Sequence, residues 1–345
     1  MNILVTGNLG YIGSVLTTKL KSEGFNSVGL DIGYFKDCIT SNSIEPTKQI
    51  LKDLRNINET DLENIDAVIH LASLSNDPLG AFIPSLTEEI NYEATIKLAT
   101  LALKKKIKKF IFASTQSIYG ISKLDSELEE DKSLKDPITA YAKTKWKAEQ
   151  EIMEMASENF CVSALRPSTV FGPSPRFRAD IVFNNLVACA FTSKKIEIWS
   201  DGSPWRPVIH VEDVCDAFIA CLKAPVSIIN KQAFNVGLKG GNYTVKDLAE
   251  AAKNCVPNSD LIFLNKTGND NRTYKVNFDK INEVLKDYFK PKWNLTNGGE
   301  ELIQYFSKIK LKEDDFRGRK TIRLKQLAYL RDNQICNEKL EFNKQ

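Results

Sequence analysis

The stretch MNILVTGNLGYIGS, residues 1–14, places an apolar run directly before three evenly spaced glycines. The glycines are Gly7, Gly10 and Gly13, in a G-x-x-G-x-x-G pattern. This spacing suits a tight turn between a strand and a helix, with a close approach of the backbone to a pyrophosphate. The N-terminus of the following helix offers free N–H groups and a positive dipole end to phosphate oxygens. The stretch therefore predicts a dinucleotide-binding turn.

Two acids follow at positions that a dinucleotide would use. Asp31 ends the next apolar run, where a carboxylate can accept hydrogen bonds from both adenosine ribose hydroxyls and repel a 2′-phosphate. We therefore expect NAD rather than NADP. Asp53 ends a third run, where its carboxylate would meet the adenine amino group; a simple loop acid is the alternative.

Apolar runs and helical patterns alternate through the first half of the chain. Continuous apolar runs separated by helices are typical of a parallel sheet covered on both faces. The expected strands span residues 2–7, 26–32, 48–54, 66–73, 109–115 and 161–172. We predict an α/β fold, a Rossmann-type doubly wound parallel sheet with a smaller C-terminal α/β substrate lobe.

The pattern changes after residue 172, where the spacing becomes irregular and Pro and Gly become frequent. We expect residues 1–172 to form an NAD-binding Rossmann domain that also receives a strand from the later chain. Residues 173–345 would form a nucleotide-sugar-binding lobe with a C-terminal helical extension, because residues 321–335 have helical apolar spacing.

The composition is that of an ordinary soluble protein. The chain has 345 residues, 42% hydrophobic and 26% charged, with a net charge of +3, which indicates neither a nucleic-acid nor a membrane partner. No apolar run reaches the roughly 18 residues of a membrane helix, and the start resembles no signal peptide. Seven scattered cysteines and two histidines argue against a metal site. We expect a cytoplasmic protein.

The stretch DPITAYAKTKWKAEQ, residues 136–150, carries Tyr141 and Lys145 four positions apart. Residues four apart on a helix share a face, so a phenol would lie beside an ammonium group. The pair is either an acid/base device, with a tyrosine pKa lowered by positive charge, or an exposed tyrosine beside an exposed lysine.

Ten pieces of the sequence, in order, resemble the extended short-chain dehydrogenase/reductase family of nucleotide-sugar epimerases, dehydratases and reductases. The pieces cover most of the chain: TGNLGYIG (6–13), Asp31, DL (53–54), HLAS (70–73), STQSIYG (114–120), YAKTK (141–145), LRPSTVFGP (165–173), RPVIHVED (206–213), FNVG (234–237) and DNRTY (270–274). The resemblance implies a nucleotide-sugar enzyme similar to UDP-glucose 4-epimerase.

The resemblance also implies roles for single residues. Tyr141 would be the acid/base at the sugar hydroxyl that becomes a ketone. Lys145 would hold the nicotinamide ribose and lower the tyrosine pKa. Thr115 would share the sugar oxygen with Tyr141, and Ser114 is the possible substitute.

The same comparison implies two sets of binding residues. The cofactor set is Gly7, Gly10, Tyr11, Ile12, Gly13, Asp31, Asp53, Leu54, Leu71, Ala72, Tyr141 and Lys145. The substrate set is Thr115, Asn185, Arg206 and Arg272, in which the two arginines clamp a diphosphate. Asn184 is the alternative to Asn185, and Arg176 and Arg178 are basic enough for the substrate cleft.

One departure from the family pattern bears on the reaction. Dehydratases follow the catalytic threonine with an Asp-Glu pair, whereas this chain has Gln116 and Ser117, which cannot act as carboxylic acids. With NAD favoured, we expect a 4-epimerase that works through a transient 4-keto sugar. An NAD(P)H-dependent 4-keto-sugar reductase is the alternative enzyme, and an NAD-binding redox sensor the alternative outside catalysis. The expected partners are a UDP, dTDP, GDP or CDP sugar and a second copy of the chain.

Overall fold

The computed structural model describes residues 1–42, 45–122, 126–266 and 273–343. Its main feature is a seven-stranded sheet in the order β10-β6-β5-β4-β1-β2-β3, and every neighbouring pair is parallel. The strands are β1 (Asn2–Thr6), β2 (Asn26–Asp31), β3 (Lys48–Leu51), β4 (Ala67–His70), β5 (Lys109–Ala113), β6 (Cys161–Pro167) and β10 (Gln232–Val236). The sheet confirms the predicted Rossmann-type fold.

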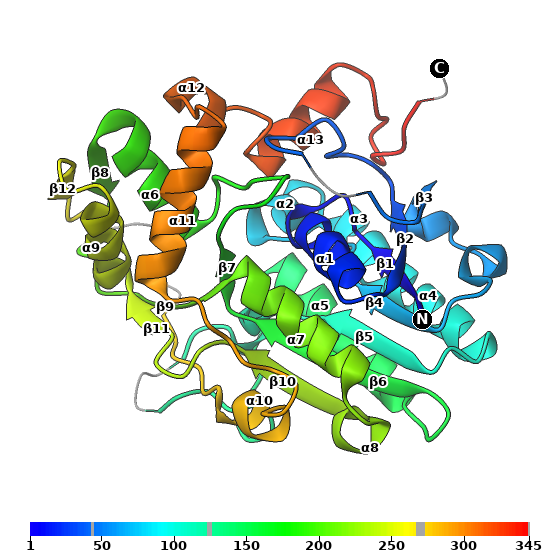
Figure 1. Cartoon of the computed structure of the whole chain (residues 1–345). Helices are drawn as coiled ribbons and strands as arrows, with labels where there is room; N and C mark the ends of the chain where they lie inside the picture. The colour runs from blue at the N-terminus through cyan, green and yellow to red at the C-terminus, as the bar shows by residue number, and fades with distance from the viewer. Residues whose placement is uncertain (43–44, 123–125, 267–272, 344–345) are drawn as a thin grey trace.

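Helices cover both faces of this sheet (Figure 1). Side chains alternate along a strand, so Ile3 and Val5 of β1 pack on one face and Leu4 on the other. The Ile3 face is covered by α1 (Tyr11–Ser22) and α7 (Val211–Lys223), and the Leu4 face by α4 (Ala94–Lys104) and α5 (Ala140–Glu154).

The later chain builds a second core. Its strands are β7 (Thr169–Phe171), β8 (Lys195–Ile198), β9 (Trp205–His210), β11 (Asn242–Thr244) and β12 (Asp260–Phe263). They form a three-stranded sheet, β11-β9-β7, and a parallel pair, β12-β8. Its helices are α6 (Val182–Ser193), α9 (Val245–Cys255), α11 (Leu295–Lys308) and α12 (Glu313–Phe316). Three other helices of the later chain pack elsewhere: α8 (Val226–Ile229) and α10 (Asp279–Val284) against the core of the seven-stranded sheet, and α13 (Arg323–Asp332) beside Tyr34 and Leu79. Phe183, Leu248 and Phe306 pack together at the centre of this second core.

Three elements differ from the sequence expectation. The run expected as one strand over 161–172 is divided into β6 and β7, and β7 pairs with β9 in the smaller sheet. The third strand ends at Leu51 because Asp53 caps a short 3-10 helix, η1 (Leu54–Asn56), by accepting the Arg55 N–H at 2.9 Å. The helical region before β5 is assembled from α2 (Asp77–Phe82), α3 (Pro84–Glu88), a π-helical turn, η3 (Glu89–Glu93), and α4. Two further 3-10 helices are η2 (Glu59–Leu62) and η4 (Gln116–Tyr119).

Over the described ranges, no helix is both long and apolar enough to cross a membrane. Within those same ranges, no cluster of three His, Cys, Asp or Glu side chains could hold a metal ion.

Candidate functional site

A cavity of about 640 Å³ lies at the carboxyl ends of the parallel strands. Its wall includes Gly7 after β1, Asp31 at the end of β2, Leu71 after β4 and Ser114 after β5. In open α/β sheets this edge is where ligands bind, because the loops there diverge and leave a crevice. All the predicted cofactor residues line this one cavity.

The glycine turn fits a dinucleotide. Gly7 has φ +73°, and a Cβ on it would lie 2.7 Å from the backbone N of Ala72. A Cβ on Gly13 would lie 2.3 Å from the carbonyl O of Gly7. Neither position tolerates a side chain, so the turn packs tightly and leaves the N-terminus of α1 facing the cavity, as a bound pyrophosphate requires.

Asp31 is held rigidly at the edge of this turn. One carboxylate oxygen accepts the Leu9 N–H at 3.1 Å and the other accepts the Gly33 N–H at 2.7 Å. Burial raises the pKa of Asp31, and these two N–H groups act in the opposite direction. The end of β2 is three strand spacings from the end of β5, roughly 14 Å, which suits an extended dinucleotide.

Asp53 and Leu54 also line the cavity, but the Asp53 carboxylate already has a partner. Arg55 donates to it from Nη2 at 2.6 Å and from Nε at 3.0 Å. Asp53 therefore meets the cavity as one half of an ion pair.

Thr115, Tyr141 and Lys145 lie together in the wall of the cavity. The hydroxyl of Thr139 caps α5 by accepting the Ala142 N–H at 3.1 Å, which fixes the turn that carries Tyr141. The Lys145 ammonium donates to the Ala113 carbonyl of β5 at 2.8 Å and lies 4.6 Å from the centre of the Phe112 ring.

The expected lowering of the tyrosine pKa by Lys145 is not found in the free chain. Burial raises the pKa of Tyr141 to about 12, and the groups that oppose it are the Thr115 hydroxyl and the Arg178 charge. Burial also lowers the pKa of Lys145 to about 7, which weakens its positive charge near neutral pH. The phenol is therefore protonated unless another cation lies beside it.

A buried ion pair lies beneath these residues. Arg166 donates from Nε to Glu149 Oε1 at 3.1 Å, and both side chains are at most 3% exposed. Ser114 donates to the same carboxylate. Because its hydroxyl is used there, Ser114 is a support of the site and not a substitute for Thr115.

Gln116 forms part of the cavity wall next to Thr115. Its side-chain NH₂ donates to the Arg166 carbonyl at 3.0 Å and to Ser168 Oγ at 3.1 Å. The amide is thus fixed by two hydrogen bonds at the position where dehydratases carry an acid.

The predicted substrate residues have mixed outcomes. Arg206 lines the cavity, whereas Asn185 is not among the described residues of its wall and donates to the Ala179 carbonyl at 2.9 Å. Asn184 is the residue that supports the site, since it donates to the Tyr11 hydroxyl at 3.2 Å. Arg272 lies outside the described residues.

Several residues of the cavity wall were not predicted from the sequence, or were predicted only as basic residues near the cleft. Arg178, singled out only by the basic string PRFR, forms an ion pair with Asp180, with Nε to Oδ1 at 2.9 Å. Ile322, Arg323 and Leu324 also line the cavity, and only the tertiary structure reveals this.

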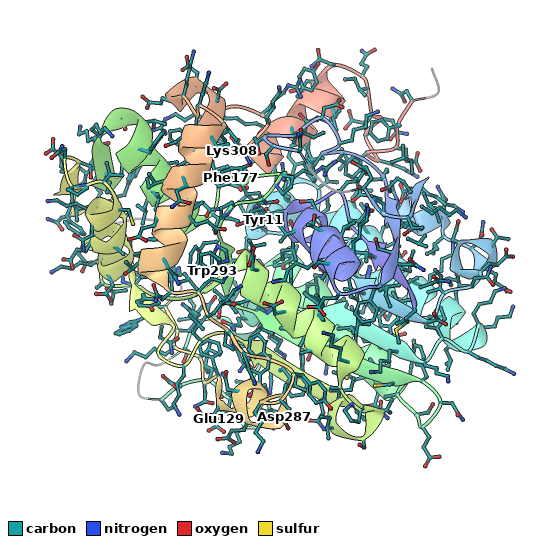
Figure 2. The ribbon with its side chains drawn as sticks, in the orientation of Figure 1. Tyr11, Glu129, Phe177, Asp287, Trp293 and Lys308 are labelled. Atoms are coloured by element: carbon teal, nitrogen blue, oxygen red, sulfur yellow. The ribbon has the colours of Figure 1, made fainter. Side chains whose placement is uncertain are left out.

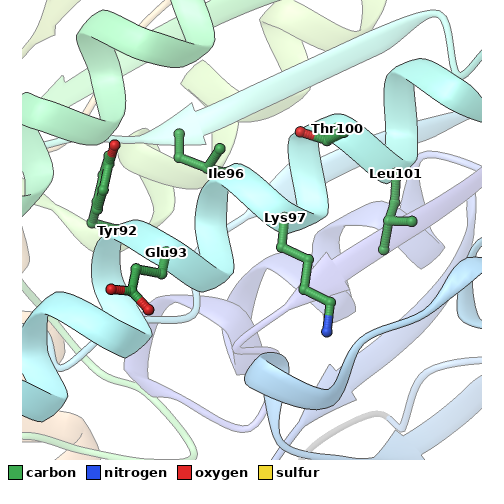
Figure 3. Close-up of a pocket in the computed structure, with 6 residues that line it drawn as sticks. All are labelled: Tyr92, Glu93, Ile96, Lys97, Thr100 and Leu101. Carbon is green, nitrogen blue, oxygen red and sulfur yellow. The ribbon is translucent and has the colours of Figure 1, made fainter.

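A second, shallower hollow lies on the surface of η3 and α4. Figure 3 shows the six residues that line it, which are Tyr92, Glu93, Ile96, Lys97, Thr100 and Leu101. These side chains project from one helical stretch and do not converge on a point, so they build no reaction site.

The match to known proteins agrees with this geometry. UDP-glucose 4-epimerase of Bacillus subtilis (strain 168) is 30% identical over 278 residues, which are 73% of this chain and 81% of the relative. UDP-glucuronic acid decarboxylase 1 of Arabidopsis thaliana is 25% identical over 326 residues, 92% of this chain and 72% of the relative. UDP-glucuronic acid 4-epimerase from Bacillus cereus, solved with UDP-glucuronic acid and NAD, has a TM-score of 0.74 at 25% identity, covering 90% of this chain and 100% of that one.

The family model for the NAD dependent epimerase/dehydratase family matches residues 3–237, more than half of the chain. This match confirms the resemblance to the extended short-chain dehydrogenase/reductase family. The chain belongs to the NAD dependent epimerase/dehydratase family, and NAD is its cofactor.

Proposed function

We propose that the chain is a nucleotide-sugar 4-epimerase that works through a transient 4-keto sugar. One observation carries the proposal: Thr115, Tyr141 and Lys145 meet in the NAD cavity, while the neighbouring positions hold Gln116 and Ser117. The acid/base group for oxidising a sugar hydroxyl is present, and the acid pair that would assist loss of water is replaced.

The roles of the residues follow from their positions. Bound NAD supplies the hydride acceptor and donor that such a reaction needs. Tyr141 takes the proton of the C4 hydroxyl and later returns it, and Thr115 hydrogen-bonds the same oxygen. Lys145 holds the nicotinamide ribose, and Asp31 the adenosine ribose. A positive charge within the cavity would lower the pKa of Tyr141 from about 12 toward the working range.

The proposed substrate is a nucleotide-diphosphate sugar, with UDP the first nucleotide to test because the relatives are named for UDP sugars. Arg206 lines the cavity, and its guanidinium suits a diphosphate; Arg272 is proposed as its partner from the sequence alone. Arg178, which is paired with Asp180, acts on Tyr141 from the same cavity wall, so it would face the sugar end of the substrate.

The test uses UDP-glucose, UDP-glucuronic acid and UDP-N-acetylglucosamine labelled with deuterium at C4, with no added cofactor. A 4-epimerase forms the C4 epimer, keeps the label at C4 and leaves no net reduced cofactor. Consumption of added NADH or NADPH in proportion to product would assign a 4-keto-sugar reductase instead. Loss of water or of CO₂ would assign a dehydratase or decarboxylase, and NAD binding without turnover of any sugar would favour a redox sensor.

We also propose a cytoplasmic homodimer with an NAD-binding part, residues 1–172, and a substrate lobe, residues 173–345. The two copies would meet through α4 and α5, and the shallow hollow around Tyr92 and Ile96 supports this choice because apolar side chains line it. Light scattering on the purified chain tests the dimer, and a monomeric mass contradicts it.

A further inference from the structure

Residues 321–343, here called the C-terminal segment, lie beyond the family match, which ends at residue 237. They fold back onto the loop that follows β2, as Figure 1 shows for α13. Gln326 donates to the Tyr34 carbonyl at 3.0 Å, and the Tyr34 hydroxyl donates to the Leu340 carbonyl at 2.6 Å. The segment therefore covers the part of the chain that carries Asp31.

A chain of hydrogen bonds joins Arg323 of this segment to the first turn of α1. Arg323 Nη2 donates to the Arg176 carbonyl at 2.6 Å, and the Arg176 N–H donates to Ser174 Oγ at 3.1 Å. Ser174 Oγ donates to the Tyr11 carbonyl at 2.8 Å. Figure 2 shows Tyr11 at the start of α1, where a pyrophosphate binds in this fold. These bonds connect Arg323 to the start of α1, and Arg323 lines the same cavity as the glycine turn.

The two arginines lack a direct countercharge. Arg323 is 2% exposed and Arg176 is 3% exposed, and neither forms an ion pair with any carboxylate that the structure describes. The Nε of Arg176 is buried with no hydrogen-bond partner in the same part of the chain. Carboxylates act on these arginines only at a distance: Asp31 acts on both, Glu45 on Arg176 and Asp180 on Arg323. The Asp31 oxygens already accept the Leu9 and Gly33 N–H groups. A buried guanidinium without a paired anion is costly, so the cavity beside Arg323 is suited to an anion.

The surroundings of Arg323 point to the same conclusion. Its guanidinium lies 4.5 Å from the centre of the Phe35 ring, and burial, with the nearby charge of Arg178, lowers its pKa to about 10. Arg178 itself is neutralised by Asp180. Arg323 lines the same cavity as Gly10, and its charge interacts with those of Asp31 and Arg178. It therefore lies between Asp31, at the adenosine end of the cofactor site, and Arg178, near Tyr141.

We propose that Arg323, held in place by the Arg176 carbonyl, binds the pyrophosphate of NAD, so that the C-terminal segment is part of the cofactor site. Guanidinium groups suit phosphate oxygens because they donate two parallel hydrogen bonds. The inference rests on the NAD cofactor and not on the 4-epimerase reaction, so a chain without epimerase activity leaves it intact.

The experiment measures NAD affinity by calorimetry on the full chain freed of cofactor. Arg323→Met keeps the aliphatic stem and removes the charge, and we expect NAD to bind about 10- to 100-fold more weakly, as for loss of a hydrogen bond to a charged group. Arg323→Lys should give an intermediate loss. Lys325→Ala is the control, because Lys325 is an exposed lysine of the same helix. Equal losses in the control would assign the effect to net charge and overturn the proposal.

Two further titrations identify which phosphate is bound. UDP affinity should be the same in Arg323→Met and in the wild type. A loss of UDP affinity without a loss of NAD affinity would assign Arg323 to the substrate diphosphate. A loss of affinity for NADP alone would assign Arg323 to a 2′-phosphate. Unchanged NAD affinity overturns the proposal in every case.

A measurement on the wild type decides the matter if Arg323→Met does not fold. NAD should slow hydrogen exchange of the α13 amides, because its pyrophosphate would hold the segment down. Exchange that is unchanged by saturating NAD would overturn the proposal.

Discussion

The two ends of the cofactor cavity differ in how their buried charges are satisfied. At the tyrosine end, around Tyr141, Glu149 is paired with Arg166, and Lys145 donates to a backbone carbonyl. At the arginine end, around Arg323 and Arg176, the described residues supply carbonyl groups and an aromatic ring but no ion pair. At the first end the Arg166–Glu149 ion pair is complete within the chain. The second is complete only when an anion is bound.

The largest expected effect is at the tyrosine end. Tyr141→Phe removes the proposed proton carrier but keeps the ring, so we expect kcat to fall about 10²- to 10⁴-fold, the usual contribution of a general acid/base. The measurement is turnover of the nucleotide sugar that the wild type converts. NAD content and melting temperature should stay the same, since Phe fills the same space. Turnover close to that of the wild type would show that another group moves the proton.

The next effect tests whether the tyrosine end depends on its buried ion pair. Glu149→Ala leaves the Arg166 guanidinium buried without its partner, and we expect the free energy of unfolding to fall by about 3–5 kcal/mol. Urea unfolding measures this change. Glu151→Ala removes an exposed carboxylate from the same helix and should cost less than about 0.5 kcal/mol. Similar costs for the two variants would mean that the pair does not hold this end together.

The third prediction concerns Asp31, which lies at the arginine end of the cavity and would select NAD over NADP. Asp31→Asn removes the charge that would accept the ribose hydroxyls, so NAD should bind about 10- to 100-fold more weakly. NADP should lose less, because the carboxylate that repels its 2′-phosphate is gone and Arg176 and Arg323 remain near. Calorimetric titration with both dinucleotides checks the prediction. Equal losses for NAD and NADP would show that Asp31 does not discriminate between them.

Local patterns predicted the fold and the centre of the site. The alternation of apolar runs and helices indicated the parallel sheet, and the glycine spacing, Asp31, Tyr141 and Lys145 all belong to one cavity wall. These features are local, since each depends on neighbours within one strand, turn or helix.

Three features could not be read from local patterns. Asn184 rather than Asn185 faces Tyr11, because adjacent helical residues point in different directions and only packing fixes which one turns inward. The pKa of Tyr141 is set by burial, which the sequence does not give. Arg323 is held at the cavity by contacts with residues far away in the sequence. Its 2.6 Å hydrogen bond to the Arg176 carbonyl, for example, joins residues 147 positions apart.

The smallest expected effect concerns the proton on Lys145. Burial lowers the pKa of Lys145 from 10.5 to about 7, so between these values the unfolded chain holds a proton that the folded chain lacks. The free energy of unfolding should therefore rise with pH in this window, by at most about 1.4 kcal/mol per pH unit, and the contribution should level off below pH 7. Lys145→Met should remove this part of the slope, whereas Lys143→Met, at an exposed position of α5, should keep it. Urea unfolding of the cofactor-free chains at pH values of about 7.5, 8.5 and 9.5 measures the difference. Equal slopes for the wild type and Lys145→Met would mean that Lys145 stays charged when folded. The tyrosine end would then hold a permanent cation beside Tyr141, and the contrast between the two ends would have to be redrawn.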